Sequence, residues 1–124
     1  AILKGALARD ECRGAHFKPD FALPGLTSTS PAERRHEAEL WCDQFEANTQ
    51  KWLKSTIATL STDGEPQLSY EDVDTSLIPP RPRLYGLVGA EVIEEVWKER
   101  QAAKSPAATD GNGASAKTAA LVGH

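Results

Sequence analysis

The sequence has 124 residues, a formal net charge of −4 and 40% hydrophobic residues. This length suits one small domain, and the hydrophobic fraction lies below the roughly 45–50% of typical globular chains. The acidic balance argues against a nucleic-acid partner, because nucleic-acid-binding domains usually carry a basic patch. We also expect no direct membrane span, since no apolar run approaches the roughly 18 residues that a transmembrane helix needs.

The first predicted element is a helix from Ala1 to about Cys12, ended by Gly14 in a left-handed conformation. Four apolar residues share one face of it: Ile2, Leu3, Ala6 and Leu7. No N-cap residue precedes this apolar stretch, and the sequence contains no methionine. A helix without a cap leaves N–H groups unpaired, so we expect this helix, and the protein, to begin upstream.

A loop over residues 15–30 leads to the second predicted helix, which runs to about Lys54. Its start fits a capping box, with Ser30 as N-cap, Pro31 as the first helical residue and Glu33 two residues later. In a capping box the serine hydroxyl and the glutamate carboxylate each accept from the other residue's backbone N–H. An aromatic and apolar stripe recurs near helical spacing, and we interpret it as core-facing rather than cofactor-stacking: Trp41, Phe45, Trp52 and Leu53.

A β-hairpin is predicted next, with strands over residues 55–61 and 67–73. The pair Asp63-Gly64 between them favours a type I′ turn, in which both central residues have positive φ. An isolated hairpin is marginally stable in water, so we expect it to lie against the helices or against a partner.

Residues 76–85 are rich in proline, which fixes its own φ and keeps the preceding residue out of the helical region, so an extended segment is predicted. A final helix follows over about residues 90–103. Its apolar residues lie on one side: Val92, Ile93, Val96 and Trp97. Residues 105–124 are mostly small and polar and are predicted to be disordered.

The predicted fold class is therefore mainly α. It is a small helical bundle of about three helices with a short β-hairpin, an extended proline-rich segment and a disordered C-terminal tail. We place the domain at residues 1–104 and the tail at residues 105–124.

The sequence contains no complete set of residues for catalysis, cofactor binding or metal binding. His16, His36 and His124 are isolated, so no metal site is predicted. Cys12 and His16 are four residues apart, but a glycine lies between them and no acid is placed to orient the histidine. The glycines never form G-x-G-x-x-G, so no nucleotide-binding turn is expected. Cys12 and Cys42 are predicted to be unpaired thiols.

Several short motifs occur in the same order as in one known family. Residues 9–16, Arg-Asp-Glu-Cys-Arg-Gly-Ala-His, resemble the R-x-E-S-R-G-x-H signature that opens the C-terminal region of succinate dehydrogenase and fumarate reductase flavoproteins. Cys12 stands where the signature has serine, and Phe17-Lys18-Pro19-Asp20-Phe21 continues the likeness. Three later elements are similar to W-L-K-x-T, Y-x-x-V-D-x-S-L-I and the P-R-x-R-x-Y ending of the menaquinone-linked bacterial type: residues 52–56, 70–78 and 80–85. The chain departs from the pattern around residues 23–48 and after Gly86.

The resemblance implies that this chain is the C-terminal part of an enzyme that interconverts succinate and fumarate through FAD. It also implies an upstream flavin domain, an iron–sulfur subunit that takes the electrons, a membrane-anchor subunit, and a peripheral location on the cytoplasmic side of the bacterial inner membrane. The flavin-linking, substrate-binding and proton-transferring residues of that family lie upstream of this region. We therefore expect the chain itself to bind no FAD and to be non-catalytic. L-aspartate oxidase shares the R-G-x-H signature, but the W-L-K and P-R-x-R-x-Y elements argue against it.

Arg13 and His16 are the residues for which a role beyond local packing is considered. They flank Gly14 in a turn that is expected to place their side chains at the rim of the domain. In one interpretation Arg13 caps carbonyl groups of its own helix and His16 fills a gap. In the other, both dock the domain onto the upstream flavin domain, where a planar guanidinium would hold carboxylate or backbone oxygens.

The competing hypothesis for the whole chain is a stand-alone helical interaction module. Its segment Pro79–Arg83 would be a polyproline II ligand for an SH3-like groove, because that conformation is preformed and loses little entropy on docking. We favour an extended segment packed along its own protein, since four flanking residues would gain from burial: Leu77, Ile78, Leu84 and Tyr85.

Overall fold

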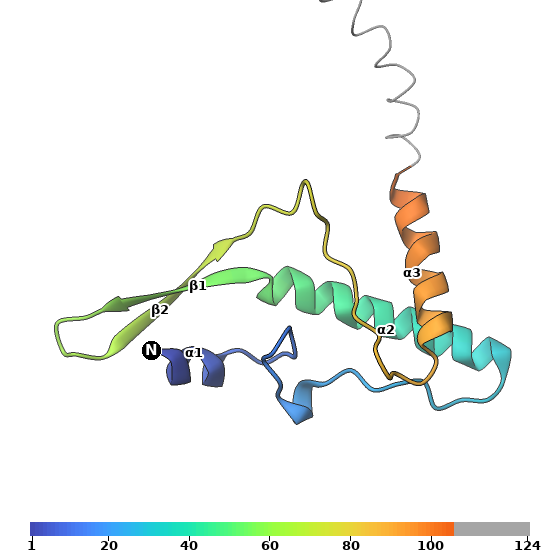
Figure 1. The fold of residues 1–124 in the computed structure, drawn as a ribbon, viewed down its shortest axis with the longest axis horizontal. Helices are drawn as coiled ribbons and strands as arrows, with labels where there is room; N and C mark the ends of the chain where they lie inside the picture. The colour runs from blue at the N-terminus through green and yellow to red at the C-terminus, as the bar shows by residue number, and fades with distance from the viewer. Residues whose placement is uncertain (106–124) are drawn as a thin grey trace, which may run out of the picture.

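The computed structural model describes residues 1–105 of the chain. In chain order it contains α1 (Ile2–Ala8), the short 3-10 helix η1 (Pro19–Phe21), α2 (Pro31–Trp52), strands β1 (Lys54–Leu60) and β2 (Pro66–Asp72), and α3 (Ala90–Lys104). The long helix α2 and the hairpin lie nearly end to end, α1 lies beside the hairpin, and α3 crosses α2 (Figure 1). The prediction of a small, mainly α fold with a short β-hairpin is confirmed. Residues 106–124, most of the predicted tail, lie outside the described residues.

The buried core lies between α2, α3 and the loop that precedes α2. Its members are Leu26, Ala38, Trp41, Cys42, Ile93 and Val96. Phe45 stacks on Trp41, with ring centroids 5.7 Å apart, and meets the edge of Trp97 at 5.3 Å. The aromatic stripe of α2 therefore faces the core, as predicted, and Trp52 at the end of the helix is buried as well.

The start of α2 lies where the sequence places it, but the capping box is wrong. Ser30 is the N-cap and Pro31 the first helical residue, yet the Ser30 side chain makes no capping hydrogen bond. The carboxylate of Glu37 instead accepts from the backbone N–H groups of Thr27 and Ser28, both at 2.8 Å. Hydrogen bonds from Ser28 and Thr27 lower the pKa of Glu37 to about 2. The loop runs back along α2. The N–H groups of Thr27 and Ser28 therefore face Glu37, which lies one helical turn after Glu33.

Two glycines allow the loop before α2 to pack closely against the segment before α3. Gly89 has a φ of +82°, and a Cβ there would overlap the side chain of Leu26. A Cβ on Gly25 would lie 2.8 Å from the backbone nitrogen of Val88. The Leu26 N–H donates to the Val88 carbonyl at 2.8 Å, so the two segments are joined as well as packed.

The hairpin is confirmed, but its turn differs from the predicted one. The strands pair antiparallel from Lys54 opposite Asp72 to Leu60 opposite Pro66. Gly64 has a φ of +86°, whereas Asp63 has no positive φ, so the turn is not type I′. The Gly64 N–H donates to the Ser61 carbonyl, and the Asp63 carboxylate accepts from the Glu65 N–H. These bonds hold a longer loop in place of the two-residue turn.

Helix α1 is shorter than predicted. It ends at Ala8, because Arg9 is extended, with φ −88° and ψ 106°, and turns toward groups on α2 and β1. Gly14 does not end the helix. Its φ of +62° belongs to a separate turn six residues further along the chain. The contacts of Arg9 therefore end the helix earlier than the apolar spacing alone predicts.

The proline-rich segment contains no helix or strand, as predicted, and it packs only in part along its own protein. Pro82 is buried and Leu84 is half-buried. Three flanking apolar residues that were expected to gain burial are exposed instead: Leu77, Ile78 and Tyr85. The last helix follows the prediction closely, with Ile93 and Val96 buried.

Candidate docking site

The predicted docking residues flank a tight turn. The Arg13 N–H donates to the His16 carbonyl and the His16 N–H donates to the Arg13 carbonyl, each at 3.0 Å. Gly14 and Ala15 are the central residues of this turn. The positive φ of Gly14 and the absence of one at Ala15 fit a type II′ turn, which needs glycine first. The turn brings Arg13 and His16 opposite each other, as the sequence indicates.

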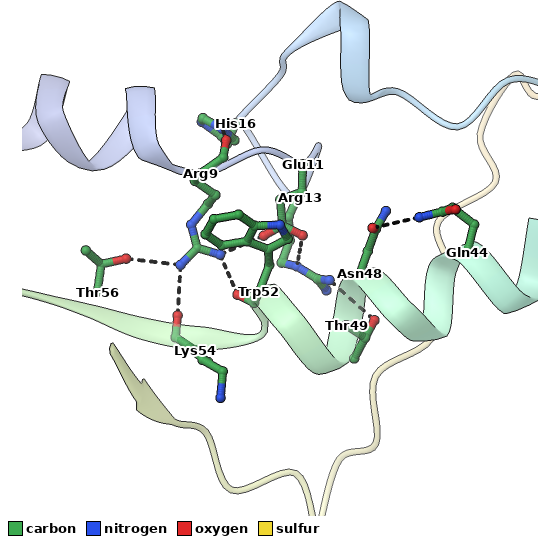
Figure 2. Close-up of polar contacts among 10 residues, drawn as sticks. All are labelled: Arg9, Glu11, Arg13, His16, Gln44, Asn48, Thr49, Trp52, Lys54 and Thr56. Carbon is green, nitrogen blue, oxygen red and sulfur yellow. Dashed lines mark hydrogen bonds and ion pairs between the residues drawn. The ribbon is translucent and has the colours of Figure 1, made fainter. Parts of the chain in front are cut away.

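A buried carboxylate lies beside this turn, between two arginines. Glu11 is 1% exposed, and its Oε1 and Oε2 accept from Arg9 at 2.6 Å and from Arg13 at 2.9 Å. We call Arg9, Glu11 and Arg13 the arginine–glutamate cluster (Figure 2). A carboxylate buried without partners would be unstable in its charged form, and two guanidinium groups compensate for its lost hydration.

Arg9 ties this cluster to the end of α2 and the start of β1. It donates to the carbonyl oxygens of Trp52 and Lys54 and to the Thr56 hydroxyl, and its guanidinium lies 5.5 Å from the Trp52 ring centroid (Figure 2). The last carbonyls of a helix have no partner within the helix, and the helix dipole favours a cation there. Arg9 therefore closes the C-terminal end of α2.

Arg13 and His16 both contribute to local structure, but Arg13 does not cap its own helix. Its Nη2 donates to the Thr49 hydroxyl of α2 at 3.3 Å, in addition to the Glu11 contact. His16 Nε2 lies 3.0 Å from the Arg9 carbonyl and so joins the turn to the residue after α1. Figure 2 shows the His16 side chain beside the cluster. The Arg13 side chain stays 28% exposed and His16 is half-buried, so both reach the surface.

The sequence alone indicated no individual role for Arg9 or Glu11. Both lie in the motif that carries the family resemblance. The alternation of basic and acidic residues at positions 9, 11 and 13 is the one feature of the sequence that could have indicated an ion-pair cluster. Burial of Glu11 follows from its position against α2, which charge alternation alone does not predict.

The two cysteines are free thiols, as predicted. Cys12 Sγ contacts the backbone of Lys18, with its N–H at 3.3 Å and its carbonyl at 3.2 Å. Cys42 is fully buried in the core, and burial raises its pKa. A buried thiol with a raised pKa is a poor nucleophile, because the thiolate is the reactive form.

The outer face of α1 is apolar and exposed. Ile2, Leu3 and Leu7 are 88%, 79% and 75% exposed. The side toward the hairpin is small and polar instead: the Lys4 ammonium donates to the Pro66 carbonyl, and a Cβ on Gly5 would lie 3.8 Å from the Thr56 methyl group. The large apolar side chains of Ile2, Leu3 and Leu7 are therefore left mostly uncovered by the rest of the described chain, whereas the smaller Ala6 is half-buried.

The residues that the structure describes do not fit an FAD site. A dinucleotide site needs glycines that let the cofactor's pyrophosphate approach a helix N-terminus. Gly89 precedes α3, but Leu26 fills the space that its missing side chain leaves, and Val88 does the same at Gly25. We therefore assign no step of a flavin reaction to these residues.

In residues 1–105 no group of three His, Cys, Asp or Glu residues is arranged to hold a metal ion. None of the described helices is long and apolar enough to cross a bilayer.

Comparison with known proteins agrees with the motifs. Residues 1–85 match the family described as the C-terminal region of fumarate reductase flavoproteins. The succinate dehydrogenase flavoprotein subunit of Bacillus subtilis (strain 168) is 38% identical over 85 residues, which are 68% of this chain and 11% of that protein. The chain thus spans about a tenth of the length of this relative. No solved structure matches the chain.

The chain belongs to the family of fumarate reductase flavoprotein C-terminal regions. The matched residues contain the arginine–glutamate cluster, the turn at Gly14 and the hairpin. Helix α3, which supplies Ile93 and Val96 to the core, lies beyond them.

Proposed function

We propose that this chain is the C-terminal domain of the flavoprotein subunit of a succinate dehydrogenase or fumarate reductase. In this proposal it is a non-catalytic part that docks on the flavin-binding part of the same subunit. The subunit would use FAD to interconvert succinate and fumarate and pass electrons to an iron–sulfur subunit. With a membrane-anchor subunit, the complex would lie peripherally on the cytoplasmic side of the bacterial inner membrane. Family membership and the likeness to the Bacillus subtilis subunit support this assignment.

The observation that carries the docking role is the exposed apolar face of α1. Burying a Leu or Ile side chain stabilises a protein by about 1.5–3 kcal/mol, so three such residues side by side favour a covered state. The charged surface of a soluble protein seldom presents a row of this kind without a partner. In the proposal, this face and the rim beside it form the contact with the flavin-binding part.

Arg13 and His16 lie in the turn that follows α1 along the chain and would supply the polar part of the contact. Arg13 is held in place by Glu11 and Thr49, and a guanidinium carries more N–H donors than these two contacts use. A pre-ordered arginine loses little side-chain entropy on binding carboxylate or backbone oxygens of a partner. His16 keeps the turn closed through its contact with the Arg9 carbonyl.

The test compares Leu7→Lys in the full-length subunit with Leu40→Lys, which places the same charge at an exposed position on α2. We expect Leu7→Lys to weaken flavin retention, raise protease sensitivity between the two parts and lower dye-linked succinate oxidation. In the 124-residue chain both variants should melt like the wild type, since both positions are largely exposed. Equal flavin retention in the two full-length variants would rule out docking through α1.

Arg13→Ala addresses the second part of the proposal. If Arg13 docks the domain, the loss of flavin retention in the full-length subunit should exceed the loss of stability in the 124-residue chain. An Arg13→Ala chain that unfolds alone, with no larger effect in the full-length subunit, would leave Arg13 a purely local role.

A further inference from the structure

A hollow lies away from α1, between the turn at Gly14, helix α2 and the proline-rich segment. Its volume is about 230 Å³. Three arginines contribute to its wall, and apolar side chains form much of the remainder: Arg13, Arg81, Arg83, Trp41, Phe45 and Leu87. We call this hollow the arginine pocket.

The arginine pocket carries positive charge that the described chain does not balance. Arg13 is paired with the buried Glu11. Arg81 reaches only Glu94, at 3.3 Å, and its side chain is 71% exposed. Arg83 makes no hydrogen bond or ion pair within residues 1–105. Glu11 also lines the pocket, but its carboxylate is already shared between Arg9 and Arg13. The guanidinium groups of Arg81 and Arg83 therefore still favour an anion there.

The backbone positions Arg81 and Arg83 at the pocket before any ligand binds. Pro82 lies between them and is buried, so it anchors the segment and fixes its own φ. In an extended chain, residues two apart lie on the same side, which agrees with both arginines lining the same pocket. A planar guanidinium suits the two oxygens of a carboxylate.

The apolar wall contains a polar group without a partner. Trp41 is 9% exposed, and its indole Nε1 is the one buried side-chain nitrogen or oxygen in residues 1–105 that lacks a hydrogen-bond partner. A buried donor without an acceptor lowers stability, and native proteins contain few of them. The same wall thus combines apolar surface with a donor that lacks an acceptor.

We propose that the arginine pocket binds a small organic carboxylate. The carboxylate would lie against Arg81 and Arg83, and the apolar body of the ligand would lie against Phe45, Trp41 and Leu87. The pocket is somewhat smaller than the roughly 300–1,000 Å³ of drug-sized sites, so the ligand is compact. No residue of α1 lines this pocket. Arg13 belongs to both proposals, but the carboxylate contacts of Arg81 and Arg83 do not depend on the proposed docking role.

Benzoate is the probe for this test, because it combines one carboxylate with a compact apolar ring. Benzamide has nearly the same shape without the charge, and inorganic phosphate has charge without an apolar body. The readout is the set of three indole N–H signals in a nitrogen-15 spectrum of the full 124-residue chain, with Trp41 assigned from Trp41→Phe. We expect benzoate to shift the Trp41 signal saturably, benzamide to leave it unchanged and phosphate to bind more weakly than benzoate.

Arg83→Gln should weaken benzoate binding by about tenfold or more, since a hydrogen bond to a charged group commonly contributes that factor. Lys51→Gln is the matched control, because it removes one positive charge from an exposed site that does not line the pocket. Arg83 has no partner in the described chain, so its loss should leave the melting temperature unchanged. The proposal fails if benzoate gives no saturable shift or if benzamide or phosphate binds as tightly. It also fails if Lys51→Gln weakens binding as much as Arg83→Gln.

Discussion

The Arg9 guanidinium and the Glu11 carboxylate lie 2.6 Å apart, and the carboxylate is almost completely removed from solvent. Arg9 also closes the end of α2, so this one pair joins the segment after α1 to the helix and the hairpin. The arginine–glutamate cluster therefore determines where three elements meet.

Glu11→Ala should be the most destabilising change in this region. It would leave two arginines without their shared carboxylate, and breaking a buried ion pair typically costs about 3–5 kcal/mol. Urea unfolding of the 124-residue chain measures the difference. Glu99→Gln, which breaks the exposed pair with Arg35, should cause a much smaller loss. Similar losses in the two variants would contradict the importance of burial at Glu11.

The stability of the chain should depend on pH through Glu37. Its pKa is lowered from 4.5 to about 2 in the folded chain, so the unfolded state binds a proton more readily. The stabilisation is present in full above about pH 5 and is lost as the pH falls from there toward 2. Thermal melts between pH 7 and pH 2, which bracket this range, should show a smaller decline for Glu37→Gln than for the wild type. Parallel curves for the two proteins would disprove this assignment.

Gly89→Ala and Gly14→Ala separate backbone strain from steric overlap. Both glycines have positive φ, so alanine should introduce about 1–3 kcal/mol of backbone strain at either position. A Cβ at Gly14 meets nothing within 4 Å, whereas one at Gly89 overlaps the buried Leu26. Overpacking typically adds about 1–3 kcal/mol, so Gly89→Ala should be clearly less stable in urea unfolding. Equal free energies of unfolding would show that Leu26 moves aside freely.

Ser30→Ala should have little effect on stability. A working serine cap contributes about 1 kcal/mol, but the Ser30 side chain makes no capping bond in this structure. A shift below about 0.5 kcal/mol, as for other surface substitutions, is expected in a thermal melt. A loss of about 1 kcal/mol would instead support the capping box predicted from the sequence.

The 124-residue chain should not oxidise succinate. Catalysis needs reacting groups positioned together, and among residues 1–105 the glycines at 25 and 89 leave no room for a flavin dinucleotide. Purified chain is mixed with FAD, succinate and a dye acceptor, and the full-length subunit serves as the positive control. Dye reduction by the chain above the level of free FAD would refute the non-catalytic assignment.

The elements that depend on neighbours close along the chain could be predicted from the sequence alone. Pro31 begins α2 where the local pattern places it, Asp63-Gly64 lies in the loop of a hairpin, and α3 runs over almost the predicted residues. The order of the family motifs is equally a property of the sequence. Turn formation, helix starts and apolar periodicity act over a few residues, so a single sequence contains the information that they need.

Which carboxylates carry the stabilising contacts depends on tertiary packing and could not be predicted from the sequence. Glu33 had the spacing of a capping residue, yet Glu37 binds the loop amides because the loop runs back along α2. Arg9 ends α1 early because its backbone acceptors, Trp52 and Lys54, lie 43 and 45 residues away in sequence. A charged side chain takes its partners from whatever groups the fold brings within hydrogen-bond distance, and distances of that kind are set by packing rather than by spacing along the chain.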